Sequence, residues 1–370
     1  MSQPTNHTSP LYIGLMSGTS LDGIDAALLD FGVHPPRVLA TTFNAYPQTL
    51  VNSLLQLHHD QAGELHQSQQ IANQLAHLYA SAVAQLLVAA NKQPIDIVAI
   101  GNHGQTIRHR PEHGYTLQLG NNALLAELSG IDVIGDFRSR DIAAGGQGAP
   151  LVPAFHRAIF GSEWHNRVIL NIGGIANITS LPADGEVFGF DTGPGNLLLD
   201  SWIRLHRQQA YDSGGAWAAS GAPIPALLAQ LLAEPYLRQA PPKSTGRDLF
   251  NLSWLQQQLA PEWRAEDVQA TLLAYTCTTI TNAIADYCTK CEQIYVCGGG
   301  AHNTTLMQAL QQQLPGIDIA TTGELGIDPD WVEACAFAWL AHRFVQRQPG
   351  NLPAVTGASG LRVLGALYPH

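Results

Sequence analysis

The sequence predicts an α/β fold of two similar domains with a cleft between them. The chain has 370 residues, more than the ~100 to 200 of one ordinary domain. Two glycine-containing hairpins of similar plan lie at residues 11–31 and 167–181, which is a weak internal duplication. Strand-like and helix-like segments alternate, as in a largely parallel sheet covered by helices. We expect a first domain over residues 1–143 and a second over 144–345, with segment 346–370 as the candidate for crossing back to the first.

Composition limits the partners and the compartment. Acidic residues outnumber basic ones by 29 to 18, the formal net charge is -11, and lysine and arginine form no stripe. Neither a nucleic acid nor a membrane is therefore expected as a partner. No apolar run approaches the ~18 to 20 residues of a membrane span, and the start MSQPTNHTSP lacks the features of a signal peptide. We expect a cytoplasmic protein.

The cysteines do not resemble a secreted disulfide framework. They are five, an odd number, and Cys277, Cys288, Cys291 and Cys297 fall in one segment. Cys288 and Cys291 form a CxxC pair, but no second pair completes a tetrahedral zinc site. Buried, reduced thiols are the favoured interpretation.

The first half of the chain predicts a hairpin, a long helix and further strands. The apolar runs LYIGLM and IDAALLDF flank the turn SGTSLDG, which favours two strands joined by a wide turn. Residues 67–90 have apolar side chains at helical spacing and no Gly or Pro, so a helix is expected there. A strand follows in IDIVAI and runs into the loop GNHGQT. TLQLG, a short helix in ALLAELSG, and IDVIGDF continue the alternation.

The second half repeats this plan. VILNI and ANITSL flank Gly173 and Gly174, EVFGF reads as a strand, and GPGNLLLDSWIRLHR turns into a helix. Residues 265–288 predict a long helix before the strand QIYVC. Asp328 and Pro329 are a suitable N-cap and first position for the helix WVEACAFAWLAHRFV.

Four glycine-rich turns point to a nucleotide. The first has backbone N–H groups at Gly18 and Gly23 and hydroxyl groups at Thr19 and Ser20, and such a nest binds phosphate without a lysine. Alone it is also an ordinary turn between strands. The segments NIGGIAN, FDTGPGN and VCGGGAHN add three more turns at which a phosphate or a nucleobase can approach the main chain. Neither GxxxxGK[ST] nor GxGxxG occurs, so P-loop and dinucleotide fingerprints are absent.

Several segments, in this order and over nearly the full chain, resemble the anhydro-N-acetylmuramic acid kinase family. They are LYIGLMSGTSLDGIDAALLDF, GNHGQTIRHRP, DFRSRDIAAGGQGAPLVP, NIGGIANIT, FDTGPGN, CGGGAHN, EACAFAWLA and VTGASGLRVLG. The resemblance implies the actin-like ATPase (ribonuclease H-like) fold of the actin, hexokinase and sugar-kinase superfamily. It implies an ATP-dependent enzyme of peptidoglycan recycling that opens the anhydro bridge with water and phosphorylates the primary oxygen, giving N-acetylmuramic acid 6-phosphate. It also implies a homodimer. Another ATP-dependent sugar kinase of this fold is the alternative.

The glycine turns and the resemblance together give the candidate nucleotide and catalytic residues. Asp191 is the candidate general base, because FDTGPGN places it at the end of a strand; the alternative is an Asp that caps the next helix. The wider superfamily has an Asp before the first Gly of its first phosphate loop, whereas Ile13 precedes Gly14 here. Asp22 is therefore the candidate Mg²⁺ ligand beside the ATP phosphates. The expected ATP-binding residues are Gly18, Thr19, Ser20, Leu21, Asp22, Gly23, Ile24, Asp25, Gly173, Gly174, Gly193, Gly195, Asn196, Gly298, Gly299 and Gly300.

Polar residues after a strand are the candidates for the sugar: His103, Gly104, Gln105 and Thr106. The spacing of the histidines from 103 to 113 argues against a metal site. Arg138 and Arg140 would point to opposite sides of an extended DFRSRD, and Arg140 is preferred for the sugar's carboxylate or ring oxygens. Arg138 is expected to pair with Asp136 or Asp141.

Glu333 begins an otherwise apolar helix, where a charge is costly unless it is paired or used. It is the last candidate for the sugar side, and the alternative is a surface Glu that favours the helix dipole.

Other classes of function fit less well. A sugar-responsive regulator needs a DNA-binding segment, and the residues before the first strand are too few for a helix-turn-helix. A chaperone-like ATPase needs a peptide-binding domain, for which no residues remain. A glycosidic hydrolase would use a carboxylate pair without the glycine turns, and a test of ATP dependence separates it from a kinase.

Overall fold

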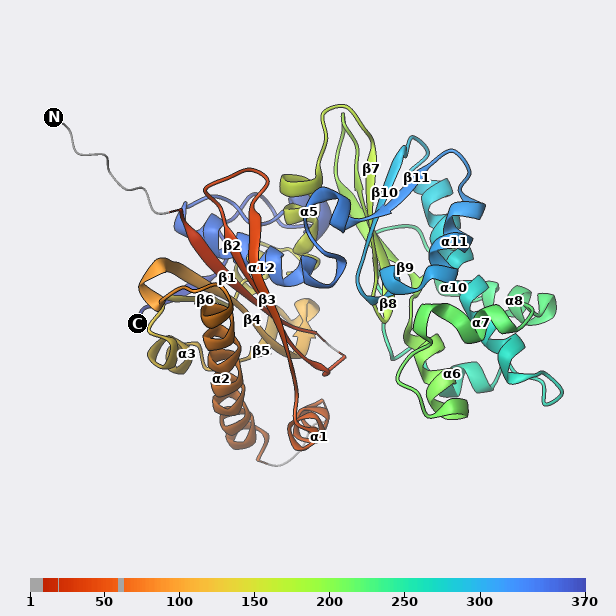
Figure 1. The fold of residues 1–370 in the computed structure, drawn as a ribbon, viewed down its shortest axis with the longest axis horizontal. Coiled ribbons are helices and arrows are strands. Elements are labelled where there is room, and N and C mark those ends of the chain that lie inside the picture. The colour runs from red at the N-terminus through yellow and green to blue at the C-terminus, as the bar shows by residue number, and fades with distance from the viewer. Residues whose placement is uncertain (1–8, 19, 59–62) are drawn as a thin grey trace. The chain divides into compact units, whose positions relative to one another are not determined.

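The computed structural model describes residues 9–18, 20–58 and 63–370 and forms two compact units (Figure 1). The first comprises residues 1–159 and 331–370, and the second Phe160–Asp330. The expected boundaries, after residues 143 and 345, differ from these. The helix α12 (Val332–Val345) packs on β1, β2 and β4 of the first unit, and the Phe155 ring of α5 (Val152–Phe160) lies 6.1 Å from that of Trp339 in α12. Both helices are therefore part of the first unit's core.

The first unit is built on a seven-stranded sheet with the order β12-β6-β4-β1-β2-β3, with β5 paired to β4. The strands β1, β2 and β3 form an antiparallel meander, β4 runs parallel to β1, and β6 runs parallel to β4. The C-terminal strand β12 pairs antiparallel with β6, so the last segment lies in this unit. The strands are β1 (Leu11–Ser17), β2 (Gly23–Asp30), β3 (Arg37–Ala45), β4 (Ile97–Arg110), β5 (Tyr115–Leu119), β6 (Val133–Gly135) and β12 (Ala366–Tyr368).

The second unit repeats this topology in a five-stranded sheet of order β11-β10-β7-β8-β9. The strands β7, β8 and β9 are an antiparallel meander, β10 is parallel to β7, and β11 is parallel to β10. The prediction of an α/β fold with two similar domains is confirmed by this shared strand order. The strands are β7 (Arg167–Ile172), β8 (Ile175–Leu181), β9 (Phe188–Pro194), β10 (Gln293–Cys297) and β11 (Asp318–Thr321).

Helices cover the first sheet on both faces. Ile13 and Leu15 of β1 belong to one apolar cluster with residues of α2 (Glu64–Ala89), such as Leu75. Gly14 lies between them and faces the other way, because side chains alternate along a strand. A Cβ on Gly14 would lie 1.8 Å from the carbonyl oxygen of Ala334, and one on Gly101 of β4 would lie 2.1 Å from that of Phe337. Gly14 and Gly101 are register partners, so together they let the backbone of α12 approach the sheet.

The remaining helices are divided between the two units, and Figure 1 labels most of them. In the first unit they are α1 (Gln48–Leu57), α3 (Asn122–Ser129), α4 (Ser139–Ile142) and α13 (Pro353–Thr356). In the second they are α6 (Leu197–Arg207), α7 (Ala216–Ser220), α8 (Pro225–Leu232), α9 (Leu252–Gln256), α10 (Ala265–Tyr287) and α11 (Thr304–Gln313). A search of the described residues finds no helix with the length and apolarity needed to span a membrane.

Four local predictions were wrong. GNHGQT is not a loop but part of β4, because this stretch pairs with β1 and β5. DFRSRD is not extended, since α4 begins at Ser139. The strand expected over EVFGF begins later and continues through Asp191 to Pro194. The helix α12 begins at Val332, because Asp328 accepts a bond from Asp330 N–H and Pro329 opens a short 3-10 turn before the helix.

Candidate active site

The turn between β1 and β2 forms the first part of the candidate site. Ser20 Oγ donates to Asp22 Oδ1 (2.9 Å), and the Gln105 side-chain amide donates to Gly18 O (3.0 Å). Among the residues that the structure describes, a Cβ on Gly18 would have no neighbour nearer than 3.6 Å, so a ligand can approach the main chain there. Leu21 and Ile24 are buried in the core. Leu21 N–H donates to Gly18 O (3.4 Å), and Ile24 pairs with Asn44 of β3. Thr19 lies outside the described residues.

Asp25 and Gly23 belong to β2 rather than to the turn. Asp25 pairs with Met16 of β1, and a Cβ on Gly23 would lie 2.4 Å from Asn44 O of β3. Gly23 is therefore needed for the approach of β3, a packing role that the sequence pattern does not distinguish from ligand binding.

A hydrogen-bonded chain links this turn to Arg138. His103 Nδ1–H donates to Ser17 O (3.2 Å), and Arg138 Nη2 donates to His103 Nε2 (2.9 Å), so the carbonyl and the guanidinium fix one neutral tautomer. Burial and, to a smaller extent, the Arg138 charge together lower the pKa of His103 to about 3. Arg138 Nη1 also donates to Gly148 O (2.8 Å). The expected pairing of Arg138 with Asp136 or Asp141 was wrong, because the turn into α4 directs Arg138 toward His103.

The carboxylates of Glu333 and Asp22 interact electrostatically with this part of the first unit. Burial raises the pKa of Glu333, the Arg138 charge lowers it, and the Asp22 charge raises it. Burial lowers the pKa of Arg138 and the Glu333 charge raises it, and the net pKa is about 10. Glu333 therefore interacts electrostatically with both Arg138 and Asp22. We call Asp22, His103, Gln105, Arg138 and Glu333 the turn cluster.

The other residues of GNHGQT have structural contacts. Gly104 has a φ of 75°, and a Cβ there would lie 2.8 Å from Leu119 O. Thr106 Oγ accepts a bond from the Gln118 amide (3.3 Å). Gln105 is fully buried and accepts from Tyr46 OH (3.3 Å). Of these residues, the contacts tie His103 and Gln105 to the turn.

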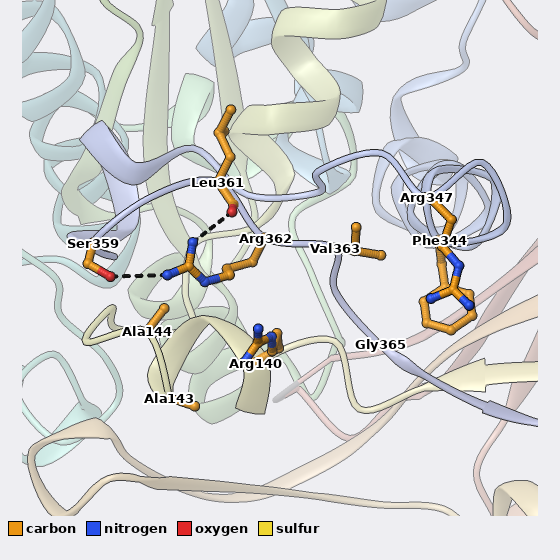
Figure 2. A pocket seen from close by; sticks show the side chains of 10 residues that line it. All are labelled: Arg140, Ala143, Ala144, Phe344, Arg347, Ser359, Leu361, Arg362, Val363 and Gly365. Atoms are coloured by element: carbon orange, nitrogen blue, oxygen red, sulfur yellow. Dashed lines mark hydrogen bonds between the residues drawn. The ribbon is translucent and has the colours of Figure 1, made fainter.

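Arg140 lies apart from the turn cluster. Its side chain lines a pocket of about 870 Å³, drawn in Figure 2, with residues from the end of α12 and from the C-terminal segment. His103 and Gly104 line a different pocket, of about 250 Å³. The structure therefore brings Arg138, and not Arg140, to the residues expected to bind the sugar.

In the second unit, three glycine turns meet at one edge of the sheet. The N–H groups of Gly195 and Asn196 donate to Gly174 O (2.9 Å) and Gly173 O (2.8 Å). The Asn196 side-chain amide donates to Ile172 O (3.1 Å). A Cβ on Gly300 would lie 2.3 Å from Ile172 Cγ2, so the triple-glycine turn after β10 lies against the end of β7. We call this edge the glycine rim; its members are Gly173, Gly174, Gly195, Asn196, Gly298, Gly299 and Gly300.

The glycines of the rim fall into two groups. A Cβ on Gly195 would lie 2.3 Å from Gly173 O, and one on Gly298 would lie 2.4 Å from Asn171 Oδ1, so these positions are glycine for packing. A Cβ on Gly173, Gly174 or Gly299 would meet nothing nearer than 3.6 Å. The main chain at this second group is open, and it offers the close approach that a phosphate or a nucleobase requires.

Asp191 lies in β9, beside the loop that follows residue 242. Thr245 N–H donates to Asp191 Oδ2 (2.9 Å), and Tyr236 OH donates to Asp191 O (2.8 Å). Burial raises the pKa of Asp191 and the Thr245 N–H bond lowers it, and the net pKa is about 6. The carboxylate does not cap α6, whose N-cap residue is Asn196. Gly193, also in β9, lies beside Thr279 of α10.

Sequence reasoning did not identify Thr245. Its Oγ1 is buried and, within the described parts of the chain, has no hydrogen-bond partner. A buried hydroxyl without a partner is unfavourable and marks a place for a water or a ligand. The segment KSTG at 243–246 has the residue types of a turn, but nothing in the sequence places it beside a residue more than 50 positions earlier.

The arrangement suits a reaction that needs one base and charge stabilisation. Asp191 is a weakly solvated carboxylate whose pKa lies near neutrality, as a general base requires. The glycine rim and the turn after β1 expose main-chain groups of the kind that hold phosphates. Within the described part of the chain, no group of three or more His, Cys, Asp or Glu side chains could hold a metal ion.

Comparison with known proteins identifies close relatives. The sequence pattern of the anhydro-N-acetylmuramic acid kinase family matches residues 10–370. The anhydro-N-acetylmuramic acid kinase of Nitrosomonas europaea is 56% identical over 360 residues, covering 97% of this chain and 99% of the relative. That of Thiobacillus denitrificans is 54% identical over 373 residues and covers 100% of both chains. Among solved structures, the activator of the 2-hydroxyisocaproyl-CoA dehydratase from Clostridium difficile with bound ADPNP has a TM-score of 0.47 at 12% identity, covering 91% of this chain and 96% of that one.

Proposed function

This chain belongs to the anhydro-N-acetylmuramic acid kinase family, and we propose that Asp191 activates the water of its reaction. The enzyme is an ATP-dependent kinase of peptidoglycan recycling. It opens the anhydro bridge of anhydro-N-acetylmuramic acid with water and phosphorylates the primary oxygen, giving N-acetylmuramic acid 6-phosphate. The observation that carries the proposal is a buried carboxylate with a pKa raised to about 6.

The water attack balances with one base. Asp191 takes a proton from water as the water oxygen bonds to the anomeric carbon and the bond from that carbon to the bridging oxygen breaks. The released primary oxygen bonds to the γ-phosphorus of ATP, and ADP leaves. Thr245 N–H occupies Asp191 Oδ2, so Oδ1 is the oxygen that we assign to the water.

Thr245 supports this assignment with its side chain. Its buried Oγ1 lacks a partner among the described residues, and its own N–H group is bonded to the proposed base. A water placed between the hydroxyl and Asp191 would satisfy both groups. We assign Thr245 as the residue that orients the attacking water.

For the nucleotide we propose the open main-chain groups. In the second unit these are Gly173, Gly174 and Gly299, where a Cβ would have free space. In the first unit the turn at Gly18 has the same property. Gly193, Gly195, Gly298 and Gly300 hold the backbone shape, and Asn196 ties the rim to Ile172.

For the sugar side we propose the turn cluster. His103 is neutral and held by Ser17 O, and Arg138 is the guanidinium that faces it. Glu333 and Gln105 belong to the same cluster, and a planar guanidinium suits a carboxylate such as that of the sugar's lactyl group. The sugar role expected for Arg140 remains a prediction. Comparison of the kinetics of Arg138 and Arg140 variants tests it.

The residues of the turn fit Mg²⁺, the ion that accompanies ATP in kinases. Asp22 is exposed, and Ser20 donates to its Oδ1. The other oxygen accepts no hydrogen bond from the described residues, so it can take a hard cation that prefers oxygen ligands. We propose Asp22 as its protein ligand. When bound, the ion neutralises charge on the ATP phosphates.

The proposal extends to the setting of the enzyme. All five cysteines are free thiols, which suits a reducing compartment, so we propose a cytoplasmic location. The acidic net charge of -11 supports an enzyme without nucleic-acid or membrane partners. A homodimer is also proposed, and sedimentation of the purified protein measures it.

The function is tested by product analysis with a panel of sugars. Wild-type enzyme with ATP and Mg²⁺ should convert anhydro-N-acetylmuramic acid to a product that carries one water and one phosphate, identified by mass spectrometry. Asp191→Asn should lower kcat by roughly 10² to 10⁴, the effect of a lost general base, while both substrates still bind. Preference for a plain amino sugar would favour the alternative of another sugar kinase. A folded Asp191→Asn enzyme of near normal rate would remove Asp191 from the mechanism.

A further inference from the structure

A pocket of about 870 Å³ in the first unit is lined by arginine side chains from three segments (Figure 2). Arg140 belongs to α4, Arg347 follows the end of α12, and Arg362 lies in the C-terminal segment. None of the ten lining residues is acidic. This concentration of positive charge is unusual in a chain with 29 acidic and 18 basic residues.

The arginines of the pocket have no anionic partner in the part of the chain that the structure describes. Within the described ranges, the guanidinium groups of Arg140 and Arg347 make no hydrogen bond or ion pair, and that of Arg347 lies over the Phe344 ring, 5.8 Å from its centroid. Arg362 donates to Leu361 O (2.8 Å) and Ser359 Oγ (3.3 Å), neither of which is charged. The guanidinium groups are therefore available to an anion.

The nearest carboxylate in the sequence cannot neutralise them. Asp141 is fully buried, and its Oδ1 accepts from Asn351 (2.8 Å) and Thr356 (2.8 Å). Its Oδ2 accepts from Gly148 N–H (2.8 Å). Both carboxylate oxygens of Asp141 thus already accept hydrogen bonds inside the fold. They are not free to pair with the arginines of the pocket.

The walls of the pocket are fixed by the same network. Ser359 N–H donates to Ala144 O (2.8 Å), which joins the loop after α4 to the C-terminal segment. Arg347 is held at a φ of 55°, a conformation that costs energy for a residue with a side chain. The backbone segments that carry the guanidinium groups are therefore joined to one another and are not separate loops.

We propose that this pocket binds a small phosphate monoester. A phosphate has nearly two negative charges and three oxygens, so it can pair with more than one guanidinium group, whereas a carboxylate is satisfied by one. The volume suits a ligand with a body as well as a charged group, and Leu361 and Val363 supply apolar contact beside the arginines. None of the lining residues belongs to the turn cluster.

The test measures hydrogen exchange of the segment 359–365 in the full-length enzyme with its nucleotide site filled by a non-hydrolysable ATP analogue. The probes are inorganic phosphate and N-acetylmuramic acid 6-phosphate, with N-acetylmuramic acid and sodium chloride at equal ionic strength as controls. The phosphate-bearing probes should slow exchange of this segment and the controls should not. Protection by the ester alone assigns the site to the product, and protection by both assigns it to phosphate in general. Equal protection by sodium chloride or by the unphosphorylated sugar would overturn the proposal.

A substitution locates the effect in the pocket. Arg347→Asn removes one guanidinium and keeps a residue that tolerates positive φ, so the fold and the basal kinase rate should be retained. The probe concentration for half-maximal protection should rise about tenfold, and Arg347→Lys should give a smaller rise. Arg110→Gln removes an exposed arginine of the same unit outside the pocket and should change nothing. An unchanged probe concentration in a folded Arg347→Asn enzyme would contradict the proposal.

Discussion

At the residue scale, the protonation of Asp191 links the structure to the chemistry. Burial raises its pKa to about 6, so the carboxylate form that accepts a proton from water predominates only above that pH. We predict that kcat/KM falls as the pH is lowered through about 6, with the slope of a single group. Assays of the wild-type enzyme across this range, at saturating Mg²⁺, measure it. A rate that stays constant down to pH 5 would mean that another group acts as the base.

The raised pKa of Asp191 also predicts how stability depends on pH. Ionisation of this group favours the reaction but lowers the stability of the fold. Because the folded-state pKa of Asp191 lies above its unfolded value, the folded protein gains stability from this group at low pH and loses it as pH rises through about 6. At pH 8 the ionised carboxylate is therefore unfavourable in the fold. Asp191→Asn should raise the free energy of unfolding by about 1 to 2 kcal/mol at pH 8 and by less at pH 4. Denaturant melts at the two pH values test this, and a destabilised variant at pH 8 would contradict it.

The two arginines of DFRSRD are predicted to differ. Arg138 donates to His103 Nε2 and lies in the turn cluster, whereas Arg140 lines the separate arginine pocket. Arg138→Ala should therefore raise the KM for the sugar more than the KM for ATP, and it should do so more than Arg140→Ala does. Steady-state kinetics of both variants provide the comparison. A larger sugar effect for Arg140→Ala would restore the prediction made from an extended segment.

At the element scale, α12 depends on two paired glycines. A Cβ on Gly14 or Gly101 would overlap a carbonyl oxygen of α12, at 1.8 and 2.1 Å. Gly14→Ala or Gly101→Ala should destabilise the protein by roughly 1–3 kcal/mol or more through overpacking, and should shift Glu333, which α12 holds in the turn cluster. Thermal melts measure the loss. The control is Gly299→Ala, whose Cβ would meet nothing nearer than 3.9 Å and should leave the melting temperature unchanged.

The elements also show what the sequence can predict. The hairpins, the long helix α2 and the glycine turns follow from local patterns of apolar residues and glycine, and they were predicted. The extension of β4 through GNHGQT depends on pairing with β1 and β5, which are not its neighbours in local sequence. The direction of Arg138 depends on a four-residue helix, and the contact of Thr245 with Asp191 on a loop that returns to β9. Such features arise from tertiary contacts, so a local pattern does not contain them.

At the scale of the whole molecule, the chain repeats one sheet topology and gives the two copies different chemistry. Each sheet has a three-strand meander whose first turn is rich in glycine, followed by two parallel strands. In the first unit this turn is joined by His103 and Arg138, which we assign to the sugar. In the second unit it is joined by the triple-glycine turn, and Asp191 follows in β9. The proposed base and the guanidinium proposed for the sugar thus belong to different copies of the topology.

The central claim is that Asp191 directs water to the anomeric carbon while the primary oxygen of the sugar takes the phosphate. The direct test is turnover in ¹⁸O-labelled water followed by mass spectrometry of fragments of the product. Labelled oxygen should appear on the anomeric carbon at the moment of formation, and the oxygen that joins carbon to phosphorus should carry none. The product is trapped by rapid reduction, before its anomeric oxygen can exchange with the labelled water. Label in the bridge to phosphorus, or an unlabelled anomeric oxygen in promptly trapped product, would contradict the mechanism.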